Sequence, residues 1–487
     1  MTRILRLDPR ALAGVPIALL LAGCTVGPGY QRPELAAPEN HRTLTTAAEA
    51  ESLADLPWWE VFQDPVLHDL INEALASNYD LRIAVARVEE ARARAGVAKS
   101  FLYPELNLTA GYGVNEVSLT TDPPQATSGD RRYENLNANF VLSWEIDLFG
   151  RLRRQNESAM AVFLATDEAR QGVVLTLVAD VATSYFALRT LDLDLEIARR
   201  TLELNDETVK LYRDRLVGGV SNKLEVNQAI ATRARTAAAI PELERQIAAQ
   251  ENLLSLLLGR NPGPIPRGTA LTDQYLQPIV PAGLPSALLD RRPDVRQAEQ
   301  LLVSANADVG AAKALFYPTI SLTGLFGGAS SDLTNLADRE SQVWSIGAGL
   351  FQPLFQAGRI RRNYEAAQAA FEQALAQYAK TAQNAFREVA DSLVAIDKLQ
   401  LVRIEQEAGV AALQEASDLA RARYDQGLSS YFEVLLADEQ LFAAELDLAN
   451  TRYGQLDAVV QLYRALGGGW QQPEEAKQAE HAEAPTQ

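Results

Sequence analysis

The stretch Ala314–Gly327 reads ALFYPTISLTGLFG, and a near copy, SFLYPELNLTAGYG, occupies Ser100–Gly113. Tyr, Pro, Leu, Thr and Gly stand at the same places in both. In each copy a helical pattern precedes the proline, and apolar and polar residues alternate after it. A proline cannot continue a helix, and a period of two is typical of a strand. Both stretches are therefore predicted to mark a change from helix to strand.

The two stretches belong to a duplication that covers most of the chain. Tyr103-Pro104 and Tyr317-Pro318 are 214 residues apart, while Gly150-Arg151 and Gly358-Arg359 are 208 residues apart. Self-similarity at a fixed spacing indicates a structural repeat, and a period this long indicates a duplicated domain. We predict repeat 1 at 57–264, a linker at 265–285 and repeat 2 at 286–470. The polar tail 471–487 is predicted to be disordered.

Each repeat is expected to hold two short helices, a β-hairpin and a long coiled-coil helical hairpin, in a fold that is mainly α. Asp64-Pro65 predicts a helix start, with an N-cap followed by proline at the first position. Strands are expected at about 105–117 and 135–148 in repeat 1, and at about 318–328 and 342–355 in repeat 2.

The segment from Arg151 to Val217 contains no proline and predicts one very long helix. Apolar residues in its second half recur at alternating spacings of three and four, which is typical of a coiled-coil seam. Gly218-Gly219 should end this helix, and Ser221 should cap a returning helix that Pro241 bends or breaks. In repeat 2 the matching tip lies near 425–430, with Gly427 and Ser429 in the corresponding roles.

The strands have one apolar face. Its most apolar members are Leu136, Phe140, Leu142, Trp144, Trp344 and Ile346. Two interpretations are open: a half-buried sheet packed on helices, or a transmembrane β-barrel with apolar residues outward. Membrane barrels need at least eight strands, and an open edge in lipid leaves backbone groups unpaired. Four strands per chain therefore predict a barrel shared among subunits, and a trimer would supply twelve strands.

The N-terminus has the layout of a secretory signal, because Arg3, Arg6 and Arg10 precede an apolar run from Ala11 to Leu21. The run is too short to span a bilayer, which takes about 20 apolar residues. It leads directly to Cys24, the one cysteine of the chain, so no intrachain disulfide can form. We predict a signal peptide at 1–23 and an extended segment at 24–56.

The composition excludes several classes of function. A formal net charge of −18 argues against nucleic-acid binding, because phosphates need basic partners. The three histidines are scattered and make a poor metal site. We find no nucleophile elbow, phosphate-binding loop or dinucleotide fingerprint. No catalytic, cofactor-binding or metal site is expected, and the chain is not expected to be an enzyme.

With these features the chain resembles the outer-membrane factor family of TolC-like exit ducts, and especially its lipoprotein branch in drug efflux. The resemblance is carried by Leu21-Ala22-Gly23-Cys24, which is similar to a lipobox, and by Pro57-Trp58-Trp59 with Asp64-Pro65. It is carried further by the doubled Tyr-Pro and Gly-Arg-x-Arg-Arg motifs and by the two tips, 215–221 and 423–429.

This resemblance implies a homotrimer with a twelve-stranded outer-membrane barrel and a helical periplasmic tube. It implies covalent lipid at Cys24, no cofactor, and Thr25 favouring transfer to the outer membrane. The implied partners are outer-membrane lipid, a periplasmic membrane-fusion adaptor and an inner-membrane transporter of the RND type, or of the MFS or ABC type. The expected function is passive exit of small amphiphilic compounds such as antibiotics, dyes and detergents. Alternatives are type I protein secretion or metal-ion efflux.

The resemblance also assigns roles to the helical tips. Contact with the adaptor is assigned to Arg215, Gly218, Gly219, Ser221, Arg423, Gly427 and Ser429, and capping of the helices would use the same glycines and serines. Many members of the family carry an aspartate where this chain has Leu436, so the chain departs from the acidic ring of those members at this position. Phe432 is the expected apolar plug, and Leu436, Asp438 and Glu439 are further gate candidates.

Overall fold

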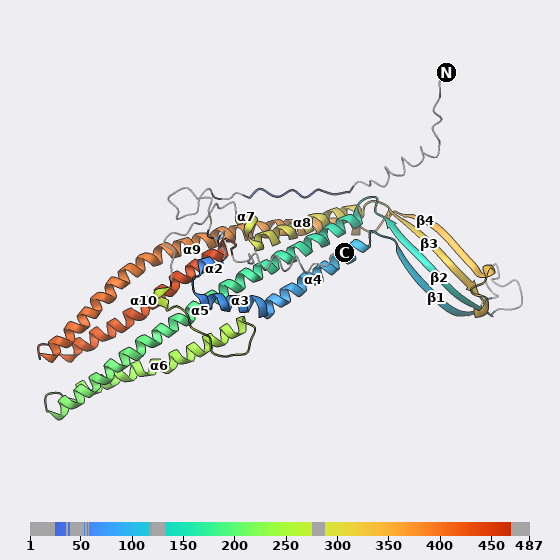
Figure 1. Ribbon diagram of the computed structural model, residues 1–487. Coiled ribbons are helices and arrows are strands. Elements are labelled where there is room, and N and C mark those ends of the chain that lie inside the picture. The colour runs from blue at the N-terminus through green and yellow to red at the C-terminus, as the bar shows by residue number, and fades with distance from the viewer. Residues whose placement is uncertain are drawn as a thin grey trace, which may run out of the picture. The chain divides into compact units, whose positions relative to one another are not determined.

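The computed structural model describes residues 25–35, 38, 53, 56, 58–116, 118, 132–274 and 288–468. The predicted signal peptide, the predicted lipid site at Cys24 and the predicted disordered tail lie outside these residues. The described chain is mainly helical and contains one β-sheet (Figure 1).

The chain divides into two compact units, and each unit is assembled from separated segments. One unit comprises Met1–Glu34, Arg87–Thr166 and Gln297–Tyr378. The other comprises Leu35–Ala86, Asp167–Arg296 and Ala379–Gln487. Both repeats therefore contribute to both units, and the long helices run through the two.

The first unit contains the sheet. Its strands are β1 (Glu105–Glu116), β2 (Arg132–Ile146), β3 (Thr319–Ser330) and β4 (Gln342–Phe351). They pair antiparallel in the order β1-β2-β3-β4. Two 3-10 turns, η4 (Leu333–Asn335) and η5 (Arg339–Ser341), connect β3 to β4. Strand β4 ends at Phe351, before the predicted end at 355. Pro353 follows, and it has no N–H group to donate to a strand ladder.

Four long helices account for most of the chain. Helices α5 (Arg151–Val217) and α9 (Arg359–Asp425) have 67 residues each, and the return helices α6 (Lys223–Leu257) and α10 (Tyr431–Ala465) have 35 each. A straight helix of the α5 length would span about 100 Å. Among the described helices, α5 alone contains a stretch apolar and long enough to cross a membrane, but 56% of that stretch is buried, as in a core helix.

Helix α6 continues through Pro241, so of the two predicted outcomes, a bend or a break, the break is wrong. A proline removes one backbone donor and costs about 3 kcal/mol in a helix interior. The neighbouring backbone hydrogen bonds remain on both sides, and burial of Val226, Thr236 and Leu254 holds α6 in place on either side of the proline.

Shorter helices precede each hairpin. They are α2 (Trp58–Val61), α3 (Pro65–Ser77) and α4 (Tyr79–Ser100) in the first repeat, and α7 (Leu288–Arg291) and α8 (Pro293–Ala314) in the second, with the 3-10 turn η2 (Leu271–Asp273) before α7. As predicted, Asp64 caps α3, and its Oδ1 accepts the amides of Val66 and Leu67 at 2.9 and 3.4 Å.

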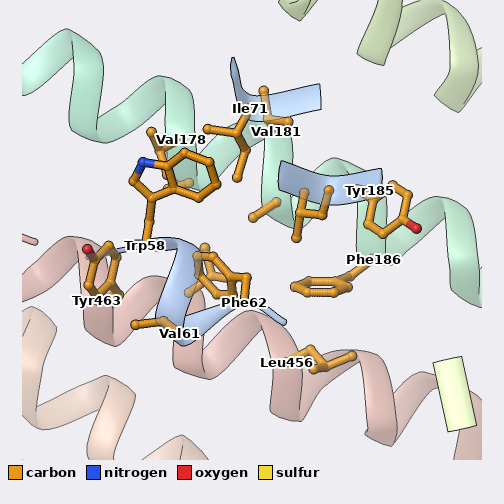
Figure 2. Packing of buried hydrophobic residues seen from close by; sticks show 14 of the residues in the cluster. Trp58, Val61, Phe62, Ile71, Val178, Val181, Tyr185, Phe186, Leu456 and Tyr463 are labelled. Atoms are coloured by element: carbon orange, nitrogen blue, oxygen red, sulfur yellow. The ribbon is translucent and has the colours of Figure 1, made fainter. Parts of the chain in front are cut away.

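Aromatic residues of α2 and its flank anchor the core of the second unit. The Phe62 ring lies edge-on to Phe186 of α5 and to Tyr463 of α10, with ring centroids 6.2 and 6.0 Å apart. Trp58 packs in the same cluster, with Ile71 and Val178 also buried there (Figure 2). Edge-to-face aromatic pairs add roughly 0.5–1.5 kcal/mol beyond the area they bury, so this short segment ties α5 to α10.

Equivalent hydrogen bonds occur in the two repeats. Asn78 Nδ2 donates to Leu257 O at 2.8 Å, at the end of α6. Its counterpart in repeat 2, Arg292, donates from Nη1 to Ala465 O at 2.9 Å, at the end of α10. The side chains differ, but both satisfy a carbonyl that a helix end leaves without a partner. The duplication is therefore retained in tertiary contacts as well as in sequence.

Candidate functional site

The tip of the first helical hairpin closes through a glycine in the left-handed conformation. Gly219 has φ +72°, the Val220 amide donates to Arg215 O at 2.9 Å, and the Gly219 amide donates to Leu216 O at 3.1 Å. This pair of bonds is the Schellman arrangement, which ends a helix with glycine. Gly218 and Gly219 are exposed, and Arg215 is partly buried.

The cap of the return helix differs from the prediction. Asn222, not Ser221, caps α6, and its Oδ1 accepts the amides of Leu224 and Glu225 at 2.9 and 3.1 Å. Ser221 Oγ instead donates to Glu225 Oε2 at 2.5 Å. The amide oxygen of asparagine fulfils the same role as a serine hydroxyl at an N-cap, so the cap is displaced by one residue.

At the second tip the end of α9 makes the same two hydrogen bonds as the end of α5 at the first tip. Gly427 has φ +71°, the Leu428 amide donates to Arg423 O at 2.9 Å, and the Gly427 amide donates to Tyr424 O at 2.9 Å. Ser430, and not the predicted Ser429, stands at the cap position of α10. Its side chain makes no capping hydrogen bond. Arg423 and Gly427 are exposed. The predicted tip residues thus lie at two equivalent turns.

Three tyrosines that the sequence did not single out as a group connect the two hairpins. We call Tyr212, Tyr424 and Tyr431 the tip aromatic cluster. The ring centroid of Tyr212 lies 4.2 Å from that of Tyr431 and 5.6 Å from that of Tyr424. Burial raises the pKa of Tyr431 to about 12, so its hydroxyl stays neutral at physiological pH. Tyr212 is one of the residues that recur at spacings of three and four in the second half of α5, and this coiled-coil pattern was the available signal.

Arg215 completes this connection. Its guanidinium lies over the Tyr424 ring, 4.5 Å from the centroid, and its Nη2 is 3.4 Å from Asp425 Oδ1. Beneath it, apolar residues of all four long helices form one buried cluster with Tyr212 and Tyr431. Within one chain the two tips are therefore linked by packing, by a cation–π contact and by an ion pair.

The gate candidates divide into two pairs. Phe432 and Leu436 lie one helical turn apart on α10 and are exposed, Phe432 by 60%. Asp438 accepts hydrogen bonds from Ser417 Oγ at 2.5 Å and from Arg421 Nη2 at 2.9 Å. Glu439 forms an ion pair with Arg235 of α6. Both carboxylates are thus paired with arginines of the same chain. The apolar side chains of Phe432 and Leu436 are instead exposed on α10.

The strand register brings all six predicted lipid-face residues to one side of the sheet. Phe140 faces Phe326 on β3, and Phe326 faces Trp344 on β4. On β1 the same side carries Leu106, Leu108 and Tyr112. Trp344 is 70% exposed. The opposite face of β2 carries asparagine, serine and glutamate, so an apolar surface crosses all four strands with a largely polar one behind it.

The segment next to the predicted lipid site is held at the end of the sheet. The Val26 amide donates to Phe149 O at 3.1 Å, and Pro28 O accepts hydrogen bonds from Arg154 Nη2 at 3.1 Å and from Asn306 Nδ2 at 3.2 Å. Thr25, which follows Cys24, lies against Gly150, the residue directly before α5. The chain immediately after Cys24 is therefore fixed where β2 passes into α5.

No group of three or more His, Cys, Asp or Glu side chains among the described residues could hold a metal ion. Several of the buried ionisable groups found there have protein partners instead. Arg292, for example, is paired with Asp294 at 2.7 Å and with Glu388 at 2.8 Å.

The chain combines an apolar-faced sheet with paired helical hairpins. Comparison with known proteins shows that it is an outer-membrane channel protein and identifies its family. The family model "Outer membrane efflux protein" matches residues 70–260 and 284–468, one match in each repeat. The chain belongs to this family. The outer-membrane factor family named from the sequence is thereby confirmed, and so is an outer-membrane efflux function.

Three similar proteins define the match further. The chain is 37% identical over 472 residues to the cation efflux system protein CusC of Escherichia coli O6:H1, covering 96% of this chain and 100% of that one. It is 39% identical over 461 residues to the solvent efflux pump outer membrane protein SrpC of Pseudomonas putida, covering 93% and 97%. The solved structure of the outer-membrane channel OprN superposes with a TM-score of 0.86 at 31% identity, covering 92% of this chain and 100% of that chain.

Proposed function

We propose that three copies of this chain close one twelve-stranded barrel in the outer membrane. The support is the four-stranded sheet, which is too small to close alone because membrane barrels have at least eight strands. Its two edge strands, β1 and β4, each have one unpaired side within the described chain. In lipid those edges need partners, and other copies of the chain can supply them.

Below the barrel, the paired hairpins α5–α6 and α9–α10 of three copies form a tube in the periplasm. The tips at Gly219 and Gly427 contact a membrane-fusion adaptor, which connects the tube to an inner-membrane transporter of the RND, MFS or ABC type. The duct is passive, since the transporter supplies the energy. It needs no cofactor and performs no chemistry on its cargo.

The anchor of this assembly is covalent lipid on Cys24. The fixed course of Val26 and Pro28 supports this role, because it begins at the end of β2, where the apolar face of the sheet ends. Each buried methylene contributes about 0.8 kcal/mol, and several acyl chains together anchor firmly. The lipid would enter the membrane beside the barrel.

The gate of the closed tube is apolar in this proposal. Phe432 and Leu436 of three copies form the constriction, since both are exposed on α10 while Asp438 and Glu439 are paired inside the chain. The tip aromatic cluster with Arg215 holds the two hairpins of each copy together. Opening would require the tips to separate against these contacts.

The cargo is proposed to be small amphiphilic compounds, including antibiotics, dyes and detergents. A second candidate is metal cations, because CusC, a relative over nearly the whole chain, is named a cation efflux protein. The chain contains two methionines and three histidines, few of the soft ligands that bind copper-like ions. The amphiphile proposal is therefore preferred.

The single observation that carries the proposal is the match of the efflux family to both repeats. Its test is deletion of the gene and measurement of growth inhibition by antibiotics, dyes, bile salts, solvents, copper and silver. Sensitivity to amphiphiles that is restored by the wild-type gene is expected. Sensitivity to metals alone would favour the second candidate, and loss of a secreted protein with unchanged sensitivities would overturn both.

A further inference from the structure

The two longest helices begin with the same backbone geometry. Gly150 precedes α5 with φ +79°, and Gly358 precedes α9 with φ +86°. The Arg154 amide donates to Gly150 O at 2.9 Å, and the Arg362 amide donates to Gly358 O, also at 2.9 Å. The two starts are 208 residues apart in the sequence. The side chains around them can therefore be compared position by position.

At the start of α5, each of three arginines has a carboxylate partner in the chain. The pairs, at N–O distances of 2.7, 3.2 and 2.8 Å, are Arg151 with Glu145, Arg153 with Asp147, and Arg154 with Glu157. Three positive and three negative charges sum to zero. This helix start is therefore neutral without any further anion.

Asp147 also satisfies the backbone of α5. Its Oδ1 accepts the Leu152 amide at 3.1 Å, and its Oδ2 accepts the Arg153 amide at 2.9 Å. These are two of the four amides that every helix leaves without an intrahelical acceptor at its N-terminus. The Arg153 side chain donates to the same carboxylate from Nε at 3.2 Å. One carboxylate thus serves two amides and one arginine.

The start of α9 has the same arginines but lacks two of the carboxylates. Pro353 stands in the place of Glu145, and Phe355 stands in the place of Asp147. The Phe355 side chain is 89% exposed and offers no oxygen to the helix. Among the described residues, no side chain accepts the two amides of α9 that are equivalent to those held by Asp147. The donors of the first repeat are thus present again without their acceptor.

The arginines of α9 consequently carry an excess of positive charge. Arg361 and Arg362 share one carboxylate, that of Glu365, at 2.9 and 2.6 Å. Arg359 donates from Nε and Nη2 to the neutral Gln356 Oε1 at 3.0 and 2.7 Å, and no carboxylate of the described chain pairs with it. Three guanidinium groups and one carboxylate leave a local charge of +2, where the start of α5 has zero.

Exposed apolar side chains lie directly before these charges. Strand β4 ends at Phe351, and Leu354 and Phe355 beyond it are 93% and 89% exposed. The apolar surface of the sheet therefore continues almost to Arg359. A chain that leaves a membrane passes from hydrocarbon into the headgroup layer, where aromatic and basic side chains are favoured. The order of apolar and basic residues here matches that passage.

We propose that the start of α9 binds the phosphate of an anionic phospholipid in the periplasmic leaflet of the outer membrane. The phosphate takes the place that the Asp147 carboxylate has at α5, and accepts hydrogen bonds from the first-turn amides of α9, from Arg359 and from Arg361. Helix N-termini bind phosphate, and arginine forms paired hydrogen bonds with phosphate oxygens. This inference rests on the proposed placement of the sheet in the membrane and of the helices in the periplasm, and adds a lipid site to it.

The apolar side chains favour a lipid over free phosphate as the occupant. Free phosphate would neutralise the arginines but leave Leu354 and Phe355 in water. A phospholipid neutralises the charge and also covers the apolar surface with its acyl chains. An anionic lipid is favoured over a zwitterionic one, because the charge of its phosphate is not balanced within its own headgroup.

Native mass spectrometry of the purified full-length protein can measure the bound lipid. The probe is phosphatidylglycerol, offered in detergent micelles together with an excess of phosphatidylcholine, and the wild type should retain phosphatidylglycerol in preference. Arg359→Gln should weaken this retention about ten-fold, which corresponds to about 1.4 kcal/mol. Arg151→Gln is the matched control at α5. It should retain as much lipid as the wild type, because the start of α5 has its own carboxylates.

Phe355→Asp tests whether the lipid occupies the place of a carboxylate. The introduced carboxylate would serve the donors of α9 as Asp147 serves those of α5, so phosphatidylglycerol retention should again fall about ten-fold. Phe355→Asn removes the same ring without adding a charge and should cause a smaller loss. Both variants should keep the thermal midpoint of the wild type, since the replaced side chain is exposed.

Four results would overturn the lipid site. They are equal retention of the two lipids by the wild type, unchanged retention in Arg359→Gln, equal losses in Phe355→Asp and Phe355→Asn, and displacement of the lipid by an equimolar amount of inorganic phosphate. Resistance of the deletion strain that expresses Phe355→Asp measures the proposed export function separately. Failure of the lipid site and failure of export are therefore distinguishable.

Discussion

The guanidinium of Arg215 lies 4.5 Å from the ring centre of Tyr424, and these residues come from the tips of different helical hairpins of one chain. An exposed cation–π contact contributes roughly 0.5–1 kcal/mol, and the ion pair of Arg215 with Asp425 adds about 0.2–1 kcal/mol. These are small energies, and in the proposed trimer the contact would be made three times. The two tips of one chain are thus joined by contacts that are individually weak.

Replacement of Arg215 by alanine should loosen the tips. It removes both the cation–π contact and the ion pair, so single channels in planar bilayers should show a higher closed-state conductance or more frequent openings. Arg213→Ala is the matched control, because Arg213 lies on the exposed side of the same helical turn. Equal effects of the two changes would show that overall charge, and not the Tyr424 contact, matters.

Replacement of Phe432 by alanine should widen the constriction. The apolar ring would no longer narrow the closed tube, and single-channel conductance should rise. Leu401→Ala, at an exposed apolar residue of α9 away from both tips, should leave the conductance unchanged. If the closed-state conductance of Phe432→Ala equals that of the wild type, Phe432 is not the plug.

Replacement of Asp64 by alanine should destabilise the second unit strongly. Asp64 is 1% exposed, and besides capping α3 it accepts bonds from Tyr185 Oη at 2.8 Å, Thr269 N at 3.0 Å and Gln274 Nε2 at 2.9 Å. Loss of an N-cap costs about 0.5–2 kcal/mol, and each buried donor left unpaired costs about 1–3 kcal/mol. The thermal midpoint followed by circular dichroism in detergent should fall by several degrees. Tyr185→Phe, which removes one of these bonds, should show a smaller loss.

Asp194 should make the stability of α5 depend on pH. Burial raises the pKa of this carboxyl group from an ordinary 3.8 to about 6. A raised pKa in the folded state means that stability is greatest below pH 4 and is lost as the pH rises through 6. The loss at neutral pH is about 3 kcal/mol, because each unit of pKa shift corresponds to about 1.4 kcal/mol.

Asp194→Asn should therefore raise the thermal midpoint at pH 7.5 and have little effect at pH 4. Asp206→Asn, at an exposed carboxylate further along α5, provides the control for a general charge effect. A gain that is the same at both pH values would exclude titration of Asp194 as the cause.

Replacement of Cys24 by serine should abolish acylation. Palmitate labelling of the protein should be lost, because serine offers no thiol for a thioether. Membrane fractionation should show less of the protein in the outer membrane or a slower arrival there. Labelling that persists in Cys24→Ser would show that the lipid site is elsewhere.

Patterns along the chain predicted the elements well, because helix and strand periods are local. The helix from Arg151 to Val217 has the predicted bounds, and the apolar face of β2 and β4 follows directly from alternation. The glycines at both tips were recognisable for the same reason, since only glycine readily adopts the left-handed conformation found there.

The side-chain partners could not be predicted, because they come from distant parts of the sequence. Asp64 bonds to Tyr185 and Thr269, which are 121 and 205 residues away. Asp438 was a gate candidate by its position after the tip, but only the packing of α9 against α10 shows that Arg421 neutralises it. The shift of the N-cap from Ser221 to Asn222 arises because both residue types are good caps and the turn geometry selects between them.

The pairing of β2 with β3 inside one chain has a consequence for the order of assembly. Because both strands belong to one polypeptide, their junction forms at a rate that does not depend on protein concentration. In the barrel proposed above, the junctions between chains would instead require collision. Folding alone would thus form half of the junctions between hairpins in that barrel and shorten the time during which bare strand edges are exposed.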